Sequence, residues 1–303
     1  MGKLVLKLLR GFLMKTKSII LTIILGIFYP FSLIPEVRRN RITFISLEHD
    51  NLSKDFKLIY ERLSEEKKYD LRTVLFKFDS SFWGNIKYGY ACIRQLFLIQ
   101  SSHLVIIDYN NFVVSKFSHR KKVKVLQLWH ATGALKKFGN DVERDYKVKN
   151  YDYTIVNSDF LKPIFARAFN LSESQVLVTG IPNNDKIFDS TFVEKTKQRL
   201  LAKYSVLKNK KIITYAPTFR GRISTHFREA LIDLEKVHQK LEEDYLIIYK
   251  SHPLISDSKY ENNERVLFIQ DELISSLFCI TDVLVTDYSA IAIDWMIFDK
   301  PII

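Results

Sequence analysis

From Arg41 onward the chain alternates short apolar runs, rich in β-branched residues, with longer segments in which apolar residues recur at helical spacing. Strands that alternate with helices are typical of parallel sheets whose faces are covered by the connecting helices. The segments expected as strands are 42–47, 71–76, 104–108, 123–128, 153–157, 176–179, 211–215, 245–249, 266–269 and 282–286. The pattern therefore predicts a doubly wound α/β protein.

A charged stretch without a strand divides this alternating region in two. We interpret residues 186–210 as a linker between an N-terminal Rossmann-like lobe, 42–185, and a C-terminal Rossmann-like lobe, 211–303. A length of 303 residues suits two domains of ordinary size. The chain stops at Pro301-Ile302-Ile303, which has the composition of an opening strand. We therefore expect the C-terminal lobe to be incomplete.

The N-terminal segment, residues 1–41, combines basic charge with the most apolar stretch of the chain, Ile19–Ile34. The whole chain has a net charge of +12, and this segment holds eight cations against the single anion Glu36. The cations lie on both sides of the apolar stretch, and Pro30 should kink or end a helix there. We interpret the segment as a membrane-associating helix that lies in an anionic leaflet. A spanning helix, a signal peptide and a helix of the folded core stay open as alternatives.

Other classes of protein are disfavoured. The excess charge lies beside an apolar segment and is not spread with aromatic residues over one face, so nucleic acid is not an expected partner. The chain has no G-x-G-x-x-G, no P-loop motif and no two Asp residues spaced two apart. We therefore expect no cofactor and no metal. The two thiols, Cys92 and Cys279, match no redox or zinc spacing and are expected to be buried.

Polar residues directly after the apolar runs are the first candidates for chemistry, because open α/β sheets bind ligands at the carboxyl ends of their strands. The candidates are His130, Asn184, Asp185, Thr218, Arg220, Lys250, His252, Asp287 and Ser289. A neutral imidazole can take a proton from an attacking hydroxyl. Cations and a helix N-terminus near Ser289 can bind a pyrophosphate. The set suits transfer of a phosphoryl-linked group.

Each candidate also has a structural interpretation. A single His at a strand end is more often structural than catalytic, and Arg220 and Lys250 are consistent with solvated cations at the rim of a lobe. Asp287 could pair with a cation of its own lobe, and the stretch around it could simply cap a helix. Asn184 and Asp185 could do no more than end a turn after a proline.

The order and spacing of these pieces resemble the CDP-glycerol glycerophosphotransferase family of teichoic acid synthesis. The resemblance covers about residues 125–303 and consists of six stretches in the same order. They are Leu128-Trp129-His130 with Gly133 and Lys136-Lys137-Phe138-Gly139; Asn157-Ser158-Asp159-Phe160 with Phe165, Ala168 and Phe169; Thr179-Gly180-Ile181-Pro182 with Asn184-Asp185; Tyr215-Ala216-Pro217-Thr218-Phe219-Arg220; Lys250 with His252-Pro253; and Thr286-Asp287-Tyr288-Ser289 with Asp294 and Lys300-Pro301.

The resemblance implies a GT-B architecture, with the active site in a cleft between the two lobes. It also implies attack by a hydroxyl of a lipid-linked polyol-phosphate acceptor on the β-phosphate of CDP-glycerol, with release of CMP. By this match His130 is the catalytic base, and His252 and Lys250 hold the donor pyrophosphate. The residues that then line the donor pocket are Thr218, Arg220, Asp287 and Ser289, with Asn184 and Asp185 as further substrate-binding candidates. The family works at the cytoplasmic face of the bacterial plasma membrane, in agreement with peripheral or monotopic attachment by residues 1–41.

Three positions depart from the family's pattern. Ala131 stands where the family usually has Gly, Asn183 where Arg is common, and Ala290 where a second Ser is usual. These departures leave CDP-ribitol open as the donor. Two other functions also stay open: a GT-B nucleotide-sugar glycosyltransferase of capsule or wall polysaccharide synthesis, and a non-catalytic membrane-bound fragment.

Overall fold

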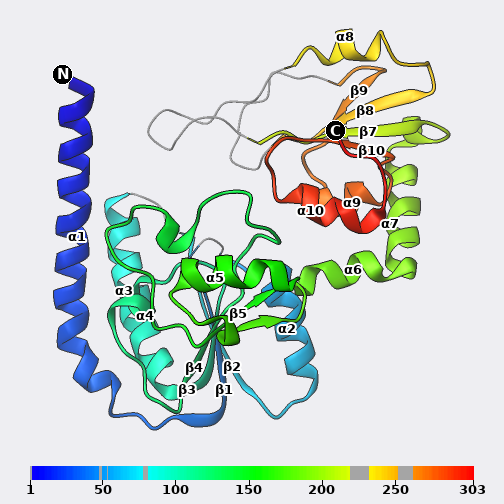
Figure 1. The fold of residues 1–303 in the computed structure, drawn as a ribbon. Helices are drawn as coiled ribbons and strands as arrows, with labels where there is room; N and C mark the ends of the chain where they lie inside the picture. Colours follow the sequence, from blue (N-terminus) through cyan, green and yellow to red (C-terminus); the bar gives the residue numbers. More distant parts are fainter. Residues whose placement is uncertain (1, 48–49, 53, 78–80, 219–231, 252–261) are drawn as a thin grey trace. The chain divides into compact units, whose positions relative to one another are not determined.

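The computed structural model describes residues 2–47, 50–52, 54–77, 81–218, 232–251 and 262–303. The chain divides into two compact units, Met1–Asn183 and Asn184–Ile303, and each contains a parallel sheet with helices (Figure 1). The prediction of an α/β protein with parallel sheets is confirmed.

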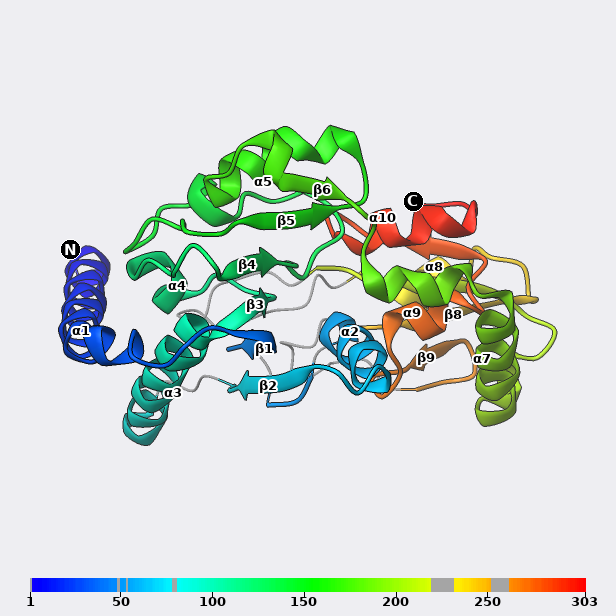
Figure 2. The same cartoon turned by 90° about the horizontal axis from the view of Figure 1, so that it is seen from below.

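The sheet of the first unit has six parallel strands in the order β2-β1-β3-β4-β5-β6 (Figure 2). The strands are β1 (Arg38–Ser46), β2 (Asp70–Leu75), β3 (Ser102–Ile107), β4 (Lys124–Gln127), β5 (Tyr153–Val156) and β6 (Val176–Val178). Each lies on one of the apolar runs, because such runs can be buried on both faces of a parallel sheet. Ile42 and Phe44 of β1 pack on one face and Ile45 on the other, as the two-residue period of a strand requires.

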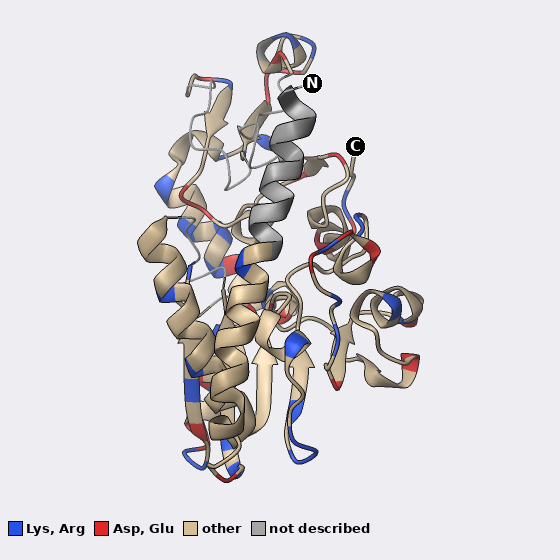
Figure 3. Cartoon of the chain, turned by 90° about the vertical axis from the view of Figure 1, so that its left-hand side faces the viewer, with Lys and Arg blue, Asp and Glu red and all other residues tan. Residues whose placement is uncertain are grey.

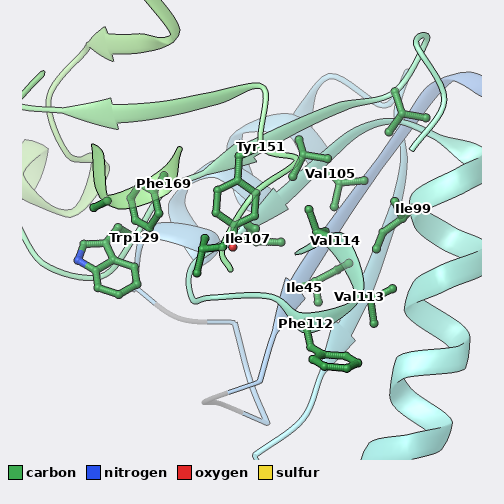
Figure 4. Packing of buried hydrophobic residues seen from close by; sticks show 14 of the residues in the cluster. Ile45, Ile99, Val105, Ile107, Phe112, Val113, Val114, Trp129, Tyr151 and Phe169 are labelled. Carbon is green, nitrogen blue, oxygen red and sulfur yellow. The ribbon is translucent and has the colours of Figure 1, made fainter. Parts of the chain in front are cut away.

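Helices cover both faces of this sheet. On one face Phe56 of α2 (Lys54–Glu65) packs edge to face on Phe44, with ring centroids 5.3 Å apart. The other face is covered by α3 (Phe82–Ser101), α4 (Phe112–Lys116) and α5 (Lys162–Phe169), whose apolar residues share one core (Figure 4). Short 3-10 turns, η1 (Gly139–Asp141), η2 (Asp159–Leu161) and η3 (Glu173–Gln175), complete the unit.

Local capping fixes where several of these helices begin. The hydroxyl of Ser81 accepts the Gly84 N–H at the start of α3, at 2.9 Å. The side chain of Asn111 accepts the Val114 N–H at the start of α4, at 3.0 Å. Both bonds satisfy backbone donors that have no partner within the helix. Asn111 thereby starts α4 four residues after the end of β3.

The N-terminal helix, α1 (Gly2–Ser32), packs along α3, and Leu25 is buried between them and the core. It ends two residues after Pro30, as expected for a residue that lacks a backbone donor. Several of its large apolar side chains stay exposed, among them Ile19, Ile23 and Ile27. Within the part of the chain that the structure describes, no helix has the combination of length and apolar character needed to cross a membrane.

The sheet of the second unit has four parallel strands in the order β10-β7-β8-β9. They are β7 (Lys211–Tyr215), β8 (Tyr245–Tyr249), β9 (Val266–Phe268) and β10 (Val283–Val285), with a short parallel bridge between Leu284 and Ile302 at one edge. Its helices are α6 (Asp185–Phe188), α7 (Ser190–Lys203), α8 (Leu234–His238), α9 (Ile274–Phe278) and α10 (Ile291–Trp295), with 3-10 turns η5 (Ser205–Leu207) and η6 (Met296–Phe298). The 3-10 turn η4 (Pro182–Asn184) spans the boundary between the two units along the chain.

Residues 186–210, which the sequence analysis interprets as a linker, are largely helical. Asp189 caps α7 by accepting the Thr191 N–H at 2.9 Å. Leu200 of α7 and Leu207 of η5 are fully buried in the core of the second unit, together with residues of β7 and β8. The segment therefore packs as part of the second unit.

Candidate active site

The candidate base of the first unit, His130, follows β4 at the carboxyl edge of the sheet. The neighbouring strand β3 ends just before Asp108 and Tyr109, so parallel pairing brings these residues beside His130. The imidazole is exposed and stacks on the Tyr109 ring, with centroids 5.0 Å apart and an interplanar angle of 16°. Tyr109 was not among the sequence candidates, although it too directly follows a predicted strand.

The hydrogen bonding of His130 assigns its tautomer. Its Nδ1 lies 3.3 Å from the backbone carbonyl oxygen of Asp108. Because a carbonyl oxygen can only accept a hydrogen bond, the proton of the neutral ring belongs on Nδ1 and the lone pair on Nε2. A neutral imidazole with its lone pair on Nε2 is equipped to act as a general base.

The residue before His130 has an unusual backbone conformation. Trp129 has a φ of 62°, in the left-handed region, which costs about 1–3 kcal/mol for a residue other than glycine. Its indole is 6% exposed and packs on Phe138 at 5.0 Å and on the edge of Phe169 at 5.4 Å between ring centroids. This aromatic packing, part of which is shown in Figure 4, stabilises the turn that presents His130.

The loop that follows His130 is anchored at Gly139. This glycine has a φ of 57°, and a Cβ at this position would overlap the backbone carbonyl of Ala168 in α5. The close approach places Phe138 against the Trp129 indole. Two exposed cations, Lys136 and Lys137, precede Phe138 in the same loop, so the segment after His130 offers positive charge to an anionic substrate.

In the second unit, three adjacent strands end in candidate residues. β10 leads to Asp287, β7 to Thr218 and β8 to Lys250. The N–H of Thr218 donates to one carboxylate oxygen of Asp287 at 3.0 Å, and its hydroxyl donates to the other at 2.8 Å. The structure therefore brings Thr218 and Asp287 together. Since Thr218 is buried, this pair joins the ends of β7 and β10.

Lys250 is held at the end of β8. Its N–H donates to the carbonyl of Tyr215 at 2.9 Å, and its ammonium group donates to the carbonyl of Gln270 at 2.6 Å. The hydroxyl of the buried Ser251 donates to the side chain of the same Gln270 at 2.9 Å. Gln270 thus fixes two consecutive residues at the carboxyl edge of the sheet.

The segment after Gln270 is tied to α7 by charge. The carboxylate of Glu272 accepts two hydrogen bonds from Arg199, at 2.8 and 2.7 Å, and one from Lys203 at 2.9 Å. The Arg199 and Lys203 hydrogen bonds lower the pKa of Glu272 from 4.5 to about 2, against the opposing effect of burial. The adjacent Asp271 also accepts a hydrogen bond from Lys203, which lowers its pKa.

Of the other substrate-binding candidates, Ser289 contacts Asp287, Asn184 and Asp185 have other surroundings, and two lie outside the described residues. Ser289 donates its backbone N–H to the Asp287 carbonyl at 2.9 Å, close to the start of α10. Asn184 is buried and its amide lies 3.5 Å from a carboxylate oxygen of Asp294, whereas Asp185 is exposed in the first turn of α6. Arg220 and His252 lie outside the described residues.

The helix-cap interpretation of the stretch 287–289 does not describe Asp287. The N-cap residue of α10 is Ala290, with no capping side chain, and the carboxylate of Asp287 is directed to Thr218. No group of three or more His, Cys, Asp or Glu side chains among the described residues is arranged to hold a metal ion.

Comparison with solved structures shows the fold. A variant of the wall teichoic acid polymerase TagF is similar with a TM-score of 0.66 and 23% identity, over 98% of this chain and 78% of that chain. The UDP-GlcNAc 2-epimerase of Methanocaldococcus jannaschii is similar with a TM-score of 0.50 and 13% identity, over 88% of this chain and 83% of that chain.

Comparison with curated proteins finds teichoic acid enzymes. The teichoic acid poly(ribitol-phosphate) polymerase of Bacillus spizizenii is 29% identical over 288 residues, 90% of this chain and 46% of the relative. The teichoic acid ribitol-phosphate primase of the same organism is 30% identical over 283 residues, 88% of this chain and 72% of the relative. The teichoic acid glycerol-phosphate primase of Bacillus subtilis is 30% identical over 226 residues, 70% of this chain and 57% of the relative. The chain spans about half to three quarters of the length of these three relatives.

A family assignment follows from the extent of the match. Residues 27–303 match the family described as CDP-glycerol:poly(glycerophosphate) glycerophosphotransferase, which includes both the His130 turn and the strand ends of the second unit. The chain therefore belongs to the CDP-glycerol:poly(glycerophosphate) glycerophosphotransferase family.

Proposed function

We propose that this protein transfers a polyol phosphate, glycerol phosphate or ribitol phosphate, from its CDP ester to a lipid-linked acceptor of the teichoic acid type, with release of CMP. Family membership and the teichoic acid relatives support the class of reaction. The observation that carries the proposal is the orientation of His130 at the carboxyl edge of the first sheet. The GT-B architecture implied by the resemblance is part of the same proposal.

His130 acts as the general base in this reaction. Nε2 accepts the proton of an acceptor hydroxyl, while the other proton stays on Nδ1 and is donated in a hydrogen bond to the Asp108 carbonyl. The hydroxyl oxygen forms a bond to the β-phosphorus of the donor, and the phosphoanhydride bond breaks. Its electron pair leaves on CMP, and the product is a phosphodiester. General base catalysis of this kind contributes about 10²- to 10⁴-fold in rate.

The second unit supplies the donor-binding groups. The Lys250 ammonium group offers positive charge that stabilises the departing CMP phosphate. Thr218 and Asp287 hold the ends of β7 and β10 in register, so that the loops after these strands, including Ser289, can bind the donor. His252 and Arg220 are assigned to the donor pyrophosphate and the donor pocket from the family match alone. One solved TagF structure, 22% identical, is of a variant soaked with CDPG.

Replacing the base tests the reaction. His130→Ala should lower the rate of CMP release by about 10²-fold or more and leave the unfolding midpoint unchanged, since the ring is exposed. The matched control is His103→Ala, because His103 is also exposed but lies at the opposite, amino end of β3. A His130→Ala protein that turns over like the His103→Ala protein would refute the base assignment.

A donor screen with the purified protein decides between the polyols and the alternatives. We expect CMP release from CDP-glycerol or CDP-ribitol in the presence of a lipid-linked acceptor, and no release of UDP from UDP-sugars. Turnover of a UDP-sugar would favour the glycosyltransferase alternative. Binding of no nucleotide donor would favour the non-catalytic alternative.

We also propose that the protein attaches peripherally to the cytoplasmic face of the bacterial plasma membrane through α1 and α3. The support is a large exposed apolar area on these two adjacent helices, which are joined by a hydrogen bond from Lys17 to Asn85 at 3.4 Å. An exposed apolar patch that is larger than those usual on a monomeric soluble protein indicates an interaction site. The exposed apolar residues are Ile19, Ile20, Ile23, Ile24, Ile27, Phe28 and Phe31 on α1, and Phe82, Trp83, Ile86 and Tyr90 on α3.

The charge on these helices favours an anionic bilayer. Neither α1 nor α3 contains an acidic residue. Their charged residues are all cations, Lys3, Lys7, Arg10, Lys15 and Lys17 in α1 and Lys87 and Arg94 in α3. Figure 3 draws Lys and Arg blue on the coloured parts of the chain. Lys and Arg beside an apolar surface are attracted to anionic lipid headgroups, and Trp and Tyr favour the membrane–water interface. The sequence analysis predicts attachment through residues 1–41 alone, and the proposal adds α3 because this helix packs against α1 and exposes apolar side chains beside it.

Vesicle sedimentation tests this attachment. The protein should bind vesicles that contain phosphatidylglycerol more tightly than vesicles of phosphatidylcholine alone. The double variant Trp83→Ser/Tyr90→Ser should lower that binding about 10-fold or more, because two aromatic contacts with the bilayer are lost. Phe160→Ser, which removes a 79% exposed aromatic residue elsewhere in the first unit, is the matched control. Equal binding by the double variant and the control would exclude α3 from the membrane surface.

A further inference from the structure

The side chain of Gln127, the last residue of β4, is completely buried at the carboxyl edge of the first sheet. A buried amide is tolerated when both its donor and its acceptor find partners. In Gln127 the amide nitrogen donates to the carbonyl of Tyr109 at 3.0 Å, and the amide oxygen accepts the N–H of Trp129 at 2.8 Å. Both partners belong to segments that contact His130.

The first of these segments is the loop after β3. It supplies the Asp108 carbonyl that binds His130 Nδ1 and the Tyr109 ring that stacks on the imidazole. The Tyr109 carbonyl that accepts the hydrogen bond from Gln127 belongs to the residue whose ring stacks on the imidazole, and it follows the Asp108 carbonyl by one residue. The bond therefore fixes the peptide directly after the two residues that contact His130.

The second segment is the left-handed turn at Trp129. A bulky residue with a φ of 62° needs tertiary support to hold that conformation. Gln127 supplies it from two residues upstream by accepting the Trp129 N–H, while Phe138 packs on the indole. The turn so held determines where the side chain of the next residue, His130, begins.

We propose that Gln127 is a positioning residue that fixes the orientation and the tautomer of His130 by joining these two segments through one amide. The proposal deepens the proposed function, because it gives the base assignment of His130 a structural cause. Neither Glu nor an apolar residue can replace Gln here. A carboxylate presents no N–H to the Tyr109 carbonyl, and an apolar side chain binds neither partner.

The tautomer of His130 tests the proposal without any enzyme assay. In ¹⁵N-labelled protein at a pH where the ring is neutral, two-bond ¹H–¹⁵N correlations should show the proton of His130 on Nδ1. Gln127→Met should shift a measurable fraction of His130 to the Nε2–H form and broaden its ring signals. A wild-type His130 with its proton on Nε2, or an unchanged tautomer in Gln127→Met, would overturn the proposal; the first result decides the question even if the variant does not fold.

The matched control is Gln100→Met. Gln100 is likewise a completely buried glutamine of the first unit whose amide donates to a backbone carbonyl, that of Ser118 at 2.7 Å, but it has no contact with the His130 turn. Its replacement should leave the His130 signals unchanged. The ring of His119, which contacts the carbonyls of Arg120 and Asn150, serves in both variants as a reporter of general unfolding.

Kinetics separate this proposal from the function on which it rests. If His130 is the base, Gln127→Met should lower kcat about 10²-fold with little change in the KM for the CDP donor, since a misplaced catalytic group costs rate rather than donor binding. A tautomer shift without any turnover in the wild type would uphold the positioning role and refute the proposed function. A tautomer shift with unaltered kcat would uphold the positioning role of Gln127 but refute the catalytic use of Nε2.

Discussion

The ion cluster around Glu272 leads to a quantitative prediction for the stability of the second unit. The Glu272 carboxylate is 7% exposed and bonds to both Arg199 and Lys203, which fastens the segment after β9 to α7. The same segment contains Gln270, which holds the candidate donor-binding residue Lys250. Replacing Glu272 by Gln removes the charge and keeps the shape.

The pKa shift gives the size of the effect. Lowering the pKa of Glu272 from 4.5 to about 2 corresponds to about 3–4 kcal/mol at roughly 1.4 kcal/mol per unit, as an upper bound. The partners Arg199 and Lys203 are 50% and 42% exposed, so solvent screens part of this, and we expect Glu272→Gln to cost about 2 kcal/mol at pH 7.

The sign of the pH dependence follows from the lowered pKa. A carboxylate whose pKa is depressed on folding adds its full stabilisation above its unfolded pKa, here 4.5, and loses it as the pH falls toward the folded value of about 2. Glu272→Gln lacks this contribution at every pH. The difference between wild type and variant should therefore shrink steadily between pH 5 and pH 3.

Thiol labelling in urea measures the stability of each unit separately. Cys279 is the one cysteine of the second unit, and Cys92 is the one cysteine of the first. Samples equilibrated at each pH are labelled briefly with a maleimide near pH 7. Glu272→Gln should lower the midpoint at Cys279 and leave that at Cys92 unchanged. Glu242→Gln, in an exposed pair with Lys211 at 4.0 Å, is the control and should change neither. A difference at Cys279 that stays constant from pH 7 to pH 3 would refute the electrostatic reasoning.

Three further predictions concern the first unit and the thiols. Gly139→Ala should lower the free energy of unfolding by at least about 2 kcal/mol, measured in urea, because Gly139 has a positive φ and an added Cβ would overlap a backbone carbonyl. Gly89→Ala, which has open space at the Cβ, should be neutral or stabilising, and equal effects of the two variants would contradict the overlap. Asn110→Leu should stabilise by about 1 kcal/mol, since neither polar atom of this buried amide has a hydrogen-bond partner among the described residues; a loss of stability in urea would show that the amide is bonded. Burial raises the pKa of Cys92 to about 12 and also raises that of Cys279, so neither thiol should react with Ellman's reagent at pH 8 until urea is added, and rapid reaction of the native protein would contradict their burial.

Much of the fold could be predicted from local patterns. Each of the ten apolar runs overlaps a strand, since β-branched apolar residues suit a sheet that is buried on both faces. The segment 186–210 shows the limit of such patterns. Its charged composition indicates a linker, but α7 buries only a narrow stripe, represented by Leu200, and exposes the rest of its surface. A one-sided helix and a charged linker have similar compositions.

The sequence predicted which strand ends carry the candidate site residues, but not which partners these residues contact. The strand-end rule identified His130, Thr218, Lys250 and Asp287 because parallel strands present their carboxyl ends at one edge. The same rule applied to β3 would have found Tyr109. No local signal marks Gln127 as a positioning residue, because a polar residue at the end of a short strand is common.

The sequence by itself determined the α/β class, the positions of the strands, the placement of His130 after β4 and the acid-free composition of α1 and α3. Only the tertiary structure decided the partners. The order β10-β7-β8-β9 joins Asp287 to Thr218, which is 69 residues away along the chain, and the pairing of β3 with β4 brings the Asp108 carbonyl to His130. Composition and spacing determine local structure, such as where a strand forms. Hydrogen bonds between strand ends depend instead on which strands become neighbours in the sheet.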